Sequence, residues 1–310
     1  MDLDSSSVDV LKRCARGEVS PEIALLQLLI AHRELSALRP FLAEAARRGT
    51  GDRAWRAALA RISGLLDAHG AGGALALRML EQESAARASA GEELERCRDL
   101  FDRWVRDSAE ASVALYSFGD PELLDAATRE VVALLDRLGV LGPGREVLDI
   151  GCGIGRFAEA LASKVAAYTG IDIASGMIEV ARRRCAGLPG VTLVPTSGRD
   201  LAPFPTGSFD LVLAIDAMPY VHRAGADFMA NHFAEAARVL RPGGDFVILN
   251  LTYRGDLARD RHELEELAAA SGLSVRRNGT RDLRLWDGTT FHLRKPALGA
   301  DQHARSSMRP

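Results

Sequence analysis

Residues 145–158 read REVLDIGCGIGRFA, and this stretch decides the fold because it combines a strand, a turn and the start of a helix. Residues 147–150 are mainly apolar and have the length of a buried parallel strand, which is too short for a helix. Gly151, Gly153 and Gly155 follow at once. Glycine lets the backbone approach a ligand closely and adopt positive φ angles. The stretch therefore predicts a nucleoside-binding turn at the end of a strand.

A second apolar run ends at Asp172, whose carboxylate can accept hydrogen bonds from the two hydroxyls of a ribose. A dinucleotide fingerprint G-x-G-x-x-G begun at Gly151 would need glycine at the place of Arg156. Begun at Gly153, the permissive form of the fingerprint ends in alanine and is met by Ala158. The spacing of the glycines alone therefore leaves a dinucleotide such as NAD open.

The composition predicts a soluble globular protein of one large or two modest domains, with 310 residues, 47% of them hydrophobic and 26% charged. A net charge of −3 gives no reason to expect nucleic acid or an anionic membrane as a partner. The apolar run at residues 23–31 is too short to span a bilayer, and the start MDLD lacks the basic residues of a signal peptide. Neither a zinc site nor a disulfide framework is expected from the four scattered cysteines, Cys14, Cys97, Cys152 and Cys185. We therefore expect a cytoplasmic protein without a metal site.

The first 110 residues are rich in Ala, Leu and Arg and predict helices throughout. Ser20 followed by Pro21 is a strong signal for a helix start, and residues 23–30 are apolar on nearly every face. Such a helix belongs inside a bundle or in a dimer interface. The glycines at residues 49–51 and 69–73 predict helix stops or short connections. The functional interpretations of this region are a lid or a homodimerisation element, and the structural alternative is a packed accessory bundle.

Strands alternate with helices in the remaining chain. Asp120 and Pro121 predict the start of a helix that Gly139 ends. Further elements are expected as helix 174–185, strand 191–194, loop 196–201, strand 209–215, helix 228–240, a tight turn at 241–244, strand 246–251, helix 257–271, and a hairpin of 283–286 with 289–293 around Asp287-Gly288. This succession predicts a parallel α/β sheet with helices on both faces and one antiparallel strand at or near its end.

The pattern Asp149-x-Gly-x-Gly-x-Gly resembles motif I of the class I S-adenosylmethionine (SAM)-dependent methyltransferases. Three further features match in the family's order: the acid at Asp172, SFDLV at 208–212 and RPGG at 241–244. The resemblance covers about residues 115–295. It implies a Rossmann-like, mostly parallel seven-stranded sheet, with SAM as the cofactor and S-adenosylhomocysteine as its product. We therefore expect a helical region at 1–110, a methyltransferase domain at 111–296 and a disordered tail at 297–310.

The resemblance also assigns cofactor contacts. It places the methionine moiety at Asp149 and the backbone of residues 151–155, and the ribose at Asp172. Cys152, within this loop, is expected to pack rather than react. The remaining cofactor contacts implied are Ile173 and Met177 at the adenine face, Ser197 and Gly198 near the adenine amino group, and Ile215 beside the sulfonium.

The candidate catalytic residues are Asp216, Tyr220 and His222, which follow the strand at 209–215. A positioned acid or base is needed when the methyl acceptor is a hydroxyl or a protonated amine. The structural alternative for His222 is a surface residue of a polar loop. Tyr116 and Tyr253 are candidate substrate-binding residues, and the alternative for Tyr116 is a place in the core or a domain seam.

Narrower interpretations fit less well. The run DAMPY at 216–220 differs from the Asp/Asn-Pro-Pro-Tyr motif that amino-methyltransferases of DNA share, because it has one residue too many and a single proline. A metal-dependent catechol-type enzyme would need a second acid-amide pair after the next strand, where Leu249, and not an acid, precedes Asn250. A metal-independent methyltransferase of small molecules is therefore expected, with an O, N, C or S acceptor. Two alternatives stay open, a non-catalytic SAM-binding scaffold assembled through the N-terminal helices and a nicotinamide oxidoreductase, which the downstream motifs disfavour.

Overall fold

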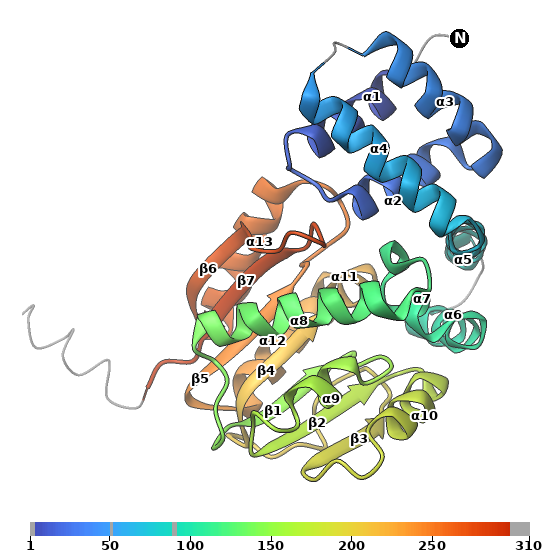
Figure 1. The fold of residues 1–310 in the computed structure, drawn as a ribbon. Coiled ribbons are helices and arrows are strands. Elements are labelled where there is room, and N and C mark those ends of the chain that lie inside the picture. Colours follow the sequence, from blue (N-terminus) through green and yellow to red (C-terminus); the bar gives the residue numbers. More distant parts are fainter. Residues whose placement is uncertain (1–3, 50–51, 89–91, 298–310) are drawn as a thin grey trace, which may run out of the picture. The chain divides into compact units, whose positions relative to one another are not determined.

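The computed structural model describes residues 4–49, 52–88 and 92–297 (Figure 1). The chain divides into two compact units, and each draws on more than one stretch of sequence. A helical unit contains the described residues of Met1–Ala90, Asp99–Val131 and Leu283–Asp287. A sheet unit contains the described residues of Gly91–Arg98, Val132–Asp282 and Gly288–Pro310. Independent folding of residues 111–296 stays a prediction, and the tail beyond 297 lies outside the described residues.

The N-terminal region is helical, as the sequence predicts. Its elements are α1 (Ser5–Ala15), α2 (Pro21–His32), α3 (Leu35–Arg48), α4 (Arg53–Ala68), α5 (Gly70–Ala88), α6 (Glu93–Asp107), α7 (Ala109–Val113), the 3₁₀ turn η1 (Leu115–Ser117) and α8 (Pro121–Leu138). The N-cap of α2 is confirmed, because the Ser20 hydroxyl accepts a hydrogen bond of 3.1 Å from the Ile23 amide. Residues on several faces of α2 are buried, including Leu25 and Leu28, so the helix lies inside the helical unit.

The glycines near residue 70 do not all end a helix. The connection between α4 and α5 is confirmed at His69, but Gly72 and Gly73 lie inside α5. A Cβ atom at Gly72 would overlap the carbonyl oxygen of Phe118, and one at Gly73 would lie 3.2 Å from a methyl group of Leu35. These glycines therefore allow α5 to pack closely within the helical unit, and the prediction of a helix stop across them was wrong.

The sheet unit contains one seven-stranded sheet in the order β3-β2-β1-β4-β5-β7-β6. The strands are β1 (Glu146–Ile150), β2 (Ala167–Asp172), β3 (Val191–Pro195), β4 (Phe209–Ile215), β5 (Leu240–Leu249), β6 (Ser274–Arg281) and β7 (Thr289–Arg294). Only β7 runs antiparallel to its neighbours among these paired strands. The predicted fold class is confirmed. The chain order reverses between β1 and β4, and ligands of open α/β sheets bind beyond the carboxyl ends of the strands at such a point.

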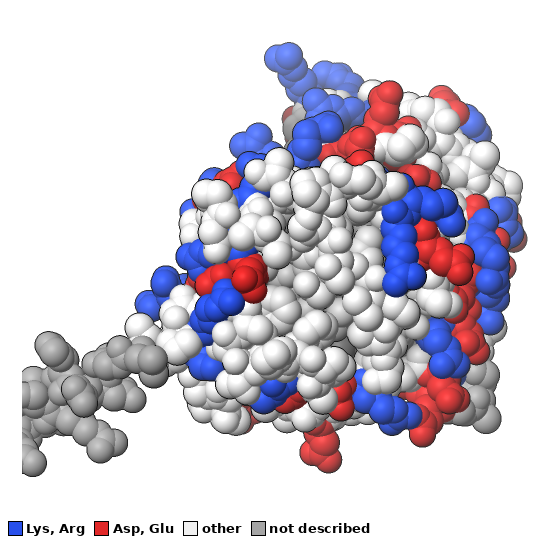
Figure 2. All heavy atoms as spheres, turned by 90° about the horizontal axis from the view of Figure 1, so that it is seen from below, with Lys and Arg blue, Asp and Glu red and all other residues white. Residues whose placement is uncertain are grey.

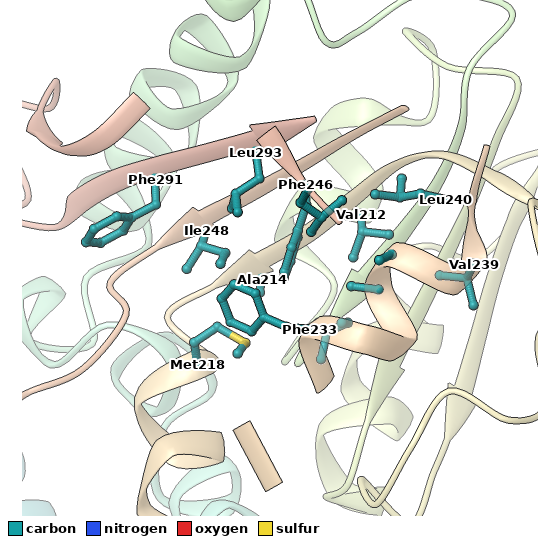
Figure 3. Packing of buried hydrophobic residues seen from close by; sticks show 14 of the residues in the cluster. Val212, Ala214, Met218, Phe233, Val239, Leu240, Phe246, Ile248, Phe291 and Leu293 are labelled. Carbon is teal, nitrogen blue, oxygen red and sulfur yellow. The ribbon is translucent and has the colours of Figure 1, made fainter. Parts of the chain in front are cut away.

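Both faces of the central strands are buried. On one face, Val212, Ala214 and Ile248 pack with residues of α11 (Met218–Arg223) and α12 (Ala226–Val239), as Figure 3 shows. The rings of Phe233 and Phe246 meet edge to face, with their centroids 5.5 Å apart. The alternate residues of the strands are also buried, as expected of parallel strands covered on both sides. The remaining helices of this unit are α9 (Arg156–Leu161), α10 (Ser175–Arg184) and α13 (Leu257–Ala270).

Two predicted elements near the end of the chain were wrong. The RPGG sequence at 241–244 is not a separate turn but an irregular stretch inside β5, where Gly243 has φ 80° and its amide donates to the Lys295 carbonyl at 2.9 Å. The partner of β7 in the hairpin is β6, at residues 274–281, and not residues 283–286. Residues 283–287 belong to the helical unit, where the Glu130 carboxylate accepts hydrogen bonds from the Arg284 and Leu285 amides at 2.7 and 2.9 Å.

Charges of both signs are interspersed on the face shown in Figure 2 and lie mainly around a broad uncharged centre. Among the described residues, no helix is long and apolar enough to cross a membrane.

Candidate functional site

The glycine loop after β1 is a tight turn held against β2. The amides of Gly151 and Cys152 both donate to the Ile171 carbonyl, at 2.8 and 3.0 Å. Gly151, Gly153 and Gly155 have φ angles of 74°, 54° and 75°, in the left-handed region that favours glycine. Added Cβ atoms would also clash, because one at Gly151 would lie 2.7 Å from the Cβ of Ala217, in the loop after β4. The positive φ angles and close packing therefore account for glycine at these positions, and their role in the approach of a ligand stays a prediction.

Asp172, at the end of β2, is bound to this loop. Its Oδ2 accepts a hydrogen bond of 2.9 Å from the Gly153 amide, and its Oδ1 accepts one of 2.9 Å from the Ala174 amide. Both carboxylate oxygens are thus fixed by the backbone, at the carboxyl end of the strand beside β1. A carboxylate oriented in this way can accept from two neighbouring hydroxyl groups of one ligand.

Asp149, in β1, is a buried acid with one unsatisfied oxygen. The residue is 1% exposed, and its Oδ2 accepts a hydrogen bond from the Tyr168 hydroxyl. Its Oδ1 has no hydrogen-bond partner among the described residues. Burial raises the pKa of Asp149 to about 7, against the lowering effect of the Tyr168 hydrogen bond. A buried carboxylate oxygen without a donor, directly before a glycine loop, fits a ligand that brings a charged or neutral N–H group.

The loop after β3 packs on the residue that follows Asp172. Gly198 has φ 71°, and a Cβ atom there would overlap Cγ2 of Ile173. Met177, on α10, is buried. The thiol of Cys152 is buried as well, which raises its pKa well above the usual range and agrees with a packing role. Ser197 caps the same loop, because its hydroxyl accepts a hydrogen bond of 3.3 Å from the Arg199 amide.

Sequence reasoning missed one segment at this loop. Residues 92–98, which include the start of α6 at Glu93, belong to the sheet unit rather than the helical unit. Leu94 lies 3.7 Å from the position of a Cβ on Gly198, and Glu92 forms an ion pair of 2.7 Å with Arg199. The segment has the composition of an ordinary surface helix, so no local signal could have placed it here.

Two polar residues meet where β4 and β5 end. Asp216 and Asn250 have φ angles of 62° and 63°, unusual values for residues other than glycine. The Asn250 side-chain amide donates to Asp216 Oδ1 at 2.9 Å, and Asn250 Oδ1 accepts from the Thr289 amide at 3.0 Å. Asp216 is therefore held by a neighbouring strand, which the sequence did not predict. Ile215, directly before it, is buried.

A pair of tyrosines in contact with each other follows β4 and β5, and one of them lies near Asp216. The rings of Tyr220 and Tyr253 meet edge to face, with centroids 5.9 Å apart, and the Arg223 guanidinium lies 4.8 Å from the centroid of the Tyr220 ring. The Tyr253 hydroxyl lies near the Asp216 carboxylate, and about half of the residue is exposed to solvent. Burial of the hydroxyl and the nearby Asp216 carboxylate raise the pKa of Tyr253 well above its usual range. Tyr253 therefore stays protonated near neutral pH and acts as a donor.

Other predicted residues lie elsewhere. His222 is not in a polar loop but in α11, where its Nε2 lies 3.8 Å from Oε1 of Glu263. Tyr116 belongs to the helical unit, where it is buried and its ring stacks on Trp286 at a centroid distance of 6.4 Å. Their predicted roles stay predictions. Among the described residues, no group of three or more His, Cys, Asp or Glu side chains could hold a metal ion.

A sheet of this order, with a glycine loop after β1 and an acid at the end of β2, has the fold of the class I methyltransferases. Residues 148–248 match the family model described as a methyltransferase domain. This part of the chain is thus similar to known methyltransferase domains.

Known relatives agree with this assignment. A demethylmenaquinone methyltransferase from Tropheryma whipplei (strain Twist) is 36% identical over 156 residues, which cover 50% of this chain and 59% of that protein. Methyltransferase GfsG from Streptomyces halstedii is 37% identical over 141 residues, covering 44% of this chain and 48% of the relative. The chain thus matches about half the length of these relatives.

A solved structure of a phosphoethanolamine N-methyltransferase from Haemonchus contortus shares the fold. It has a TM-score of 0.51 and 18% identity, and the match covers 67% of this chain and 50% of that one.

Proposed function

We propose that this protein transfers a methyl group from SAM to a small-molecule acceptor, without a metal ion. The observation that carries the proposal is the pair of acids around the glycine loop, where Asp172 is oriented by two backbone amides and Asp149 has a buried oxygen without a donor. The similarity of this chain to methyltransferases named for demethylmenaquinone and for fatty acids supports a small-molecule acceptor. The donor set around Asp216 contains an amide and a phenol, which favours proton handling over metal binding.

The residues present fit SAM. Asp172 would accept from the ribose hydroxyls, and the buried oxygen of Asp149 would accept an N–H of the methionine ammonium group, beside the backbone of residues 151–155. The adenine would lie against Ile173, with the further contacts Met177, Ser197 and Gly198. Cys152 would pack beneath the loop, and Ile215 would border the sulfonium.

SAM, when bound, supplies an electrophilic methyl carbon on a positively charged sulfur. The chain must align the acceptor with this carbon and receive the proton that the acceptor loses. We assign proton acceptance to Asp216, because its carboxylate is oriented by Asn250 and lies near the Tyr253 hydroxyl. The proton of an acceptor hydroxyl becomes strongly acidic as its oxygen gains the methyl group, so a carboxylate is a sufficient base for an oxygen acceptor. Tyr220 and Tyr253 would contact the acceptor, and His222 beside Glu263 is the alternative base.

Calorimetric titration with S-adenosylhomocysteine, and with NADH in parallel, tests the cofactor. We expect saturable binding of S-adenosylhomocysteine alone, and loss of that binding in Asp172→Ala with the fold retained by circular dichroism. Unchanged affinity in this variant would refute the ribose assignment, and binding of NADH alone would support an oxidoreductase. Binding without transfer of labelled methyl to demethylmenaquinone, a fatty acid, an aliphatic amine or a thiol would favour the scaffold alternative.

The proposal extends to the setting of the reaction. A small-molecule acceptor makes nucleic acid an unneeded partner, and a cytoplasmic location suits the four free, buried cysteines. The helical unit, with Tyr116 as a candidate substrate contact, would act as a lid or as the interface of a homodimer. Sedimentation of the full chain tests the dimer, because a monomer at micromolar concentration would leave only the lid role.

A further inference from the structure

Asp216 and Asn250, whose side chains are hydrogen-bonded, both have an unusual backbone conformation. Each residue directly follows a strand, Asp216 after β4 and Asn250 after β5, and the two strands are parallel neighbours. Both residues adopt left-handed backbone angles, which cost free energy for any residue with a Cβ and are found mainly at functional sites. Asn and Asp tolerate this conformation best among the residues that carry side chains. The two strand ends are therefore shaped so that these side chains meet.

The orientation of the Asn250 amide is determined by its partners. Its oxygen accepts hydrogen bonds from the Thr289 amide at 3.0 Å and, at 3.5 Å, from the Thr289 hydroxyl, so its NH₂ group must face Asp216. Backbone hydrogen bonds link the same strands. The Asn250 backbone amide donates to the Thr289 carbonyl at 2.9 Å, and the Asp216 backbone amide donates to the Leu249 carbonyl at 2.9 Å. Three strands thus fix one carboxylate.

We propose that Asn250 is a positioning residue for methyl transfer, which holds the Asp216 carboxylate in the orientation that receives the acceptor's proton. The Tyr253 hydroxyl lies near the same carboxylate. This inference rests on the proposed function and deepens it. A base held in a fixed orientation is useful to an acceptor that loses a proton as it is methylated. The acceptor class is therefore a hydroxyl or an amine rather than a thiolate, which carries no proton to remove.

In the methyl-transfer step, the acceptor's lone pair forms the new bond to the methyl carbon, and the bond from sulfur to that carbon breaks. The bonding electrons stay on sulfur, which becomes a neutral thioether. The proton on the acceptor's O or N passes to a carboxylate oxygen of Asp216. Asn250 takes no part in these bonds and acts only through Asp216.

The test compares single variants with an exchanged pair. Asn250→Asp keeps the tolerance for left-handed angles and the acceptor for Thr289, but it removes the donor and places two carboxylates face to face. Asp216→Asn combined with Asn250→Asp restores one donor and one acceptor with the positions exchanged. Turnover is measured with tritiated SAM and an acceptor from the panel of demethylmenaquinone, a fatty acid, an aliphatic amine and a thiol, taking the one that is methylated fastest. Binding of S-adenosylhomocysteine is measured in parallel.

We expect Asn250→Asp to lower kcat about tenfold or more and to lower the melting temperature, while its affinity for S-adenosylhomocysteine stays within about twofold of the parent chain. The exchanged pair should regain the melting temperature but not kcat, because the carboxylate then lies on the wrong strand. Tyr253→Phe should lower kcat with a smaller effect on KM.

Recovery of kcat in the exchanged pair, or an unchanged kcat in Asn250→Asp, would show a merely structural role and overturn the inference. Fastest turnover of the thiol, with no loss in Asp216→Asn, would overturn the acceptor class. If the parent chain neither binds S-adenosylhomocysteine nor methylates any panel member, the proposed function falls and this inference falls with it. Normal binding and turnover by the parent chain separate the two failures.

Discussion

The buried acid Asp149 predicts that cofactor affinity depends on pH. Burial raises the pKa of this carboxyl to about 7 in the free protein. If the ammonium group of the ligand binds its unsatisfied oxygen, the ionised form binds better, and the ligand must displace a proton whenever Asp149 is protonated. With a pKa of about 7, roughly one tenth of the protein is ionised at this site at pH 6 and about nine tenths at pH 8.

The affinity for S-adenosylhomocysteine should therefore rise about tenfold between pH 6 and pH 8. Calorimetric titration at several pH values, repeated in buffers of different ionisation enthalpy, measures both the affinity and the proton released. Asp149→Asn is the matched control, because it keeps the shape and an acceptor for the Tyr168 hydroxyl but cannot ionise. The ligand's own titration affects both proteins equally, so the ratio of their affinities isolates Asp149. Equal pH dependence in the two proteins would refute the reasoning.

The same carboxyl should affect folding in the opposite direction. Because its pKa is raised in the folded state, the unfolded chain releases this proton first, and the contribution of Asp149 to the free energy of unfolding falls as the pH rises from about 4 to about 7. As the pH rises, the affinity for the ligand should thus increase while the contribution of Asp149 to the stability of the free protein decreases.

Two further substitutions test the packing described above. Gly155→Ala should lower the free energy of unfolding by about 1–3 kcal/mol more than Gly187→Ala, because both sites have positive φ angles but only at Gly155 would the new Cβ meet Ala181, at 2.9 Å. Equal losses in urea denaturation would show that backbone strain alone matters at the glycine loop. Glu130→Ala should cost about 1–2 kcal/mol, since it leaves two backbone amides of the β6–β7 connection without their acceptor, whereas Glu130→Gln should cost less. Similar losses in the two Glu130 variants would contradict this account.

The sequence predicted those parts of the fold that carry local signals. β1 and β4 are short apolar runs followed by turns. The N-caps Ser20 and Asp120 mark the starts of their helices, because their side chains accept hydrogen bonds from backbone amides. β6 was missed because it reads SVRRNGTR, which is polar along most of its length. As the edge strand beside β7 it needs little apolar surface, and charged residues are common on such edges.

The candidate site was only partly predictable for a related reason. The glycine loop and Asp172 lie close together in sequence, and their spacing is a known pattern. The contact between Asp216 and Asn250 depends on strand order and on left-handed backbone angles at residues other than glycine, neither of which the sequence displays. Likewise, the place of Leu94 beside Gly198 follows from tertiary packing of a helix whose own pattern is ordinary.

The division of the chain bears on how such a protein can be recombined. The boundaries between the two units fall after residues 90, 98, 131, 282 and 287, so neither unit is a continuous block of sequence. A genetic crossover at any one of these points would leave part of one unit encoded with the other. A crossover after residue 131 or 282, for example, would separate Glu130 from Leu285, whose amide it binds. A chimera that replaces the helical unit must therefore exchange three segments together, and substitutions at their contacts should be inherited as a set.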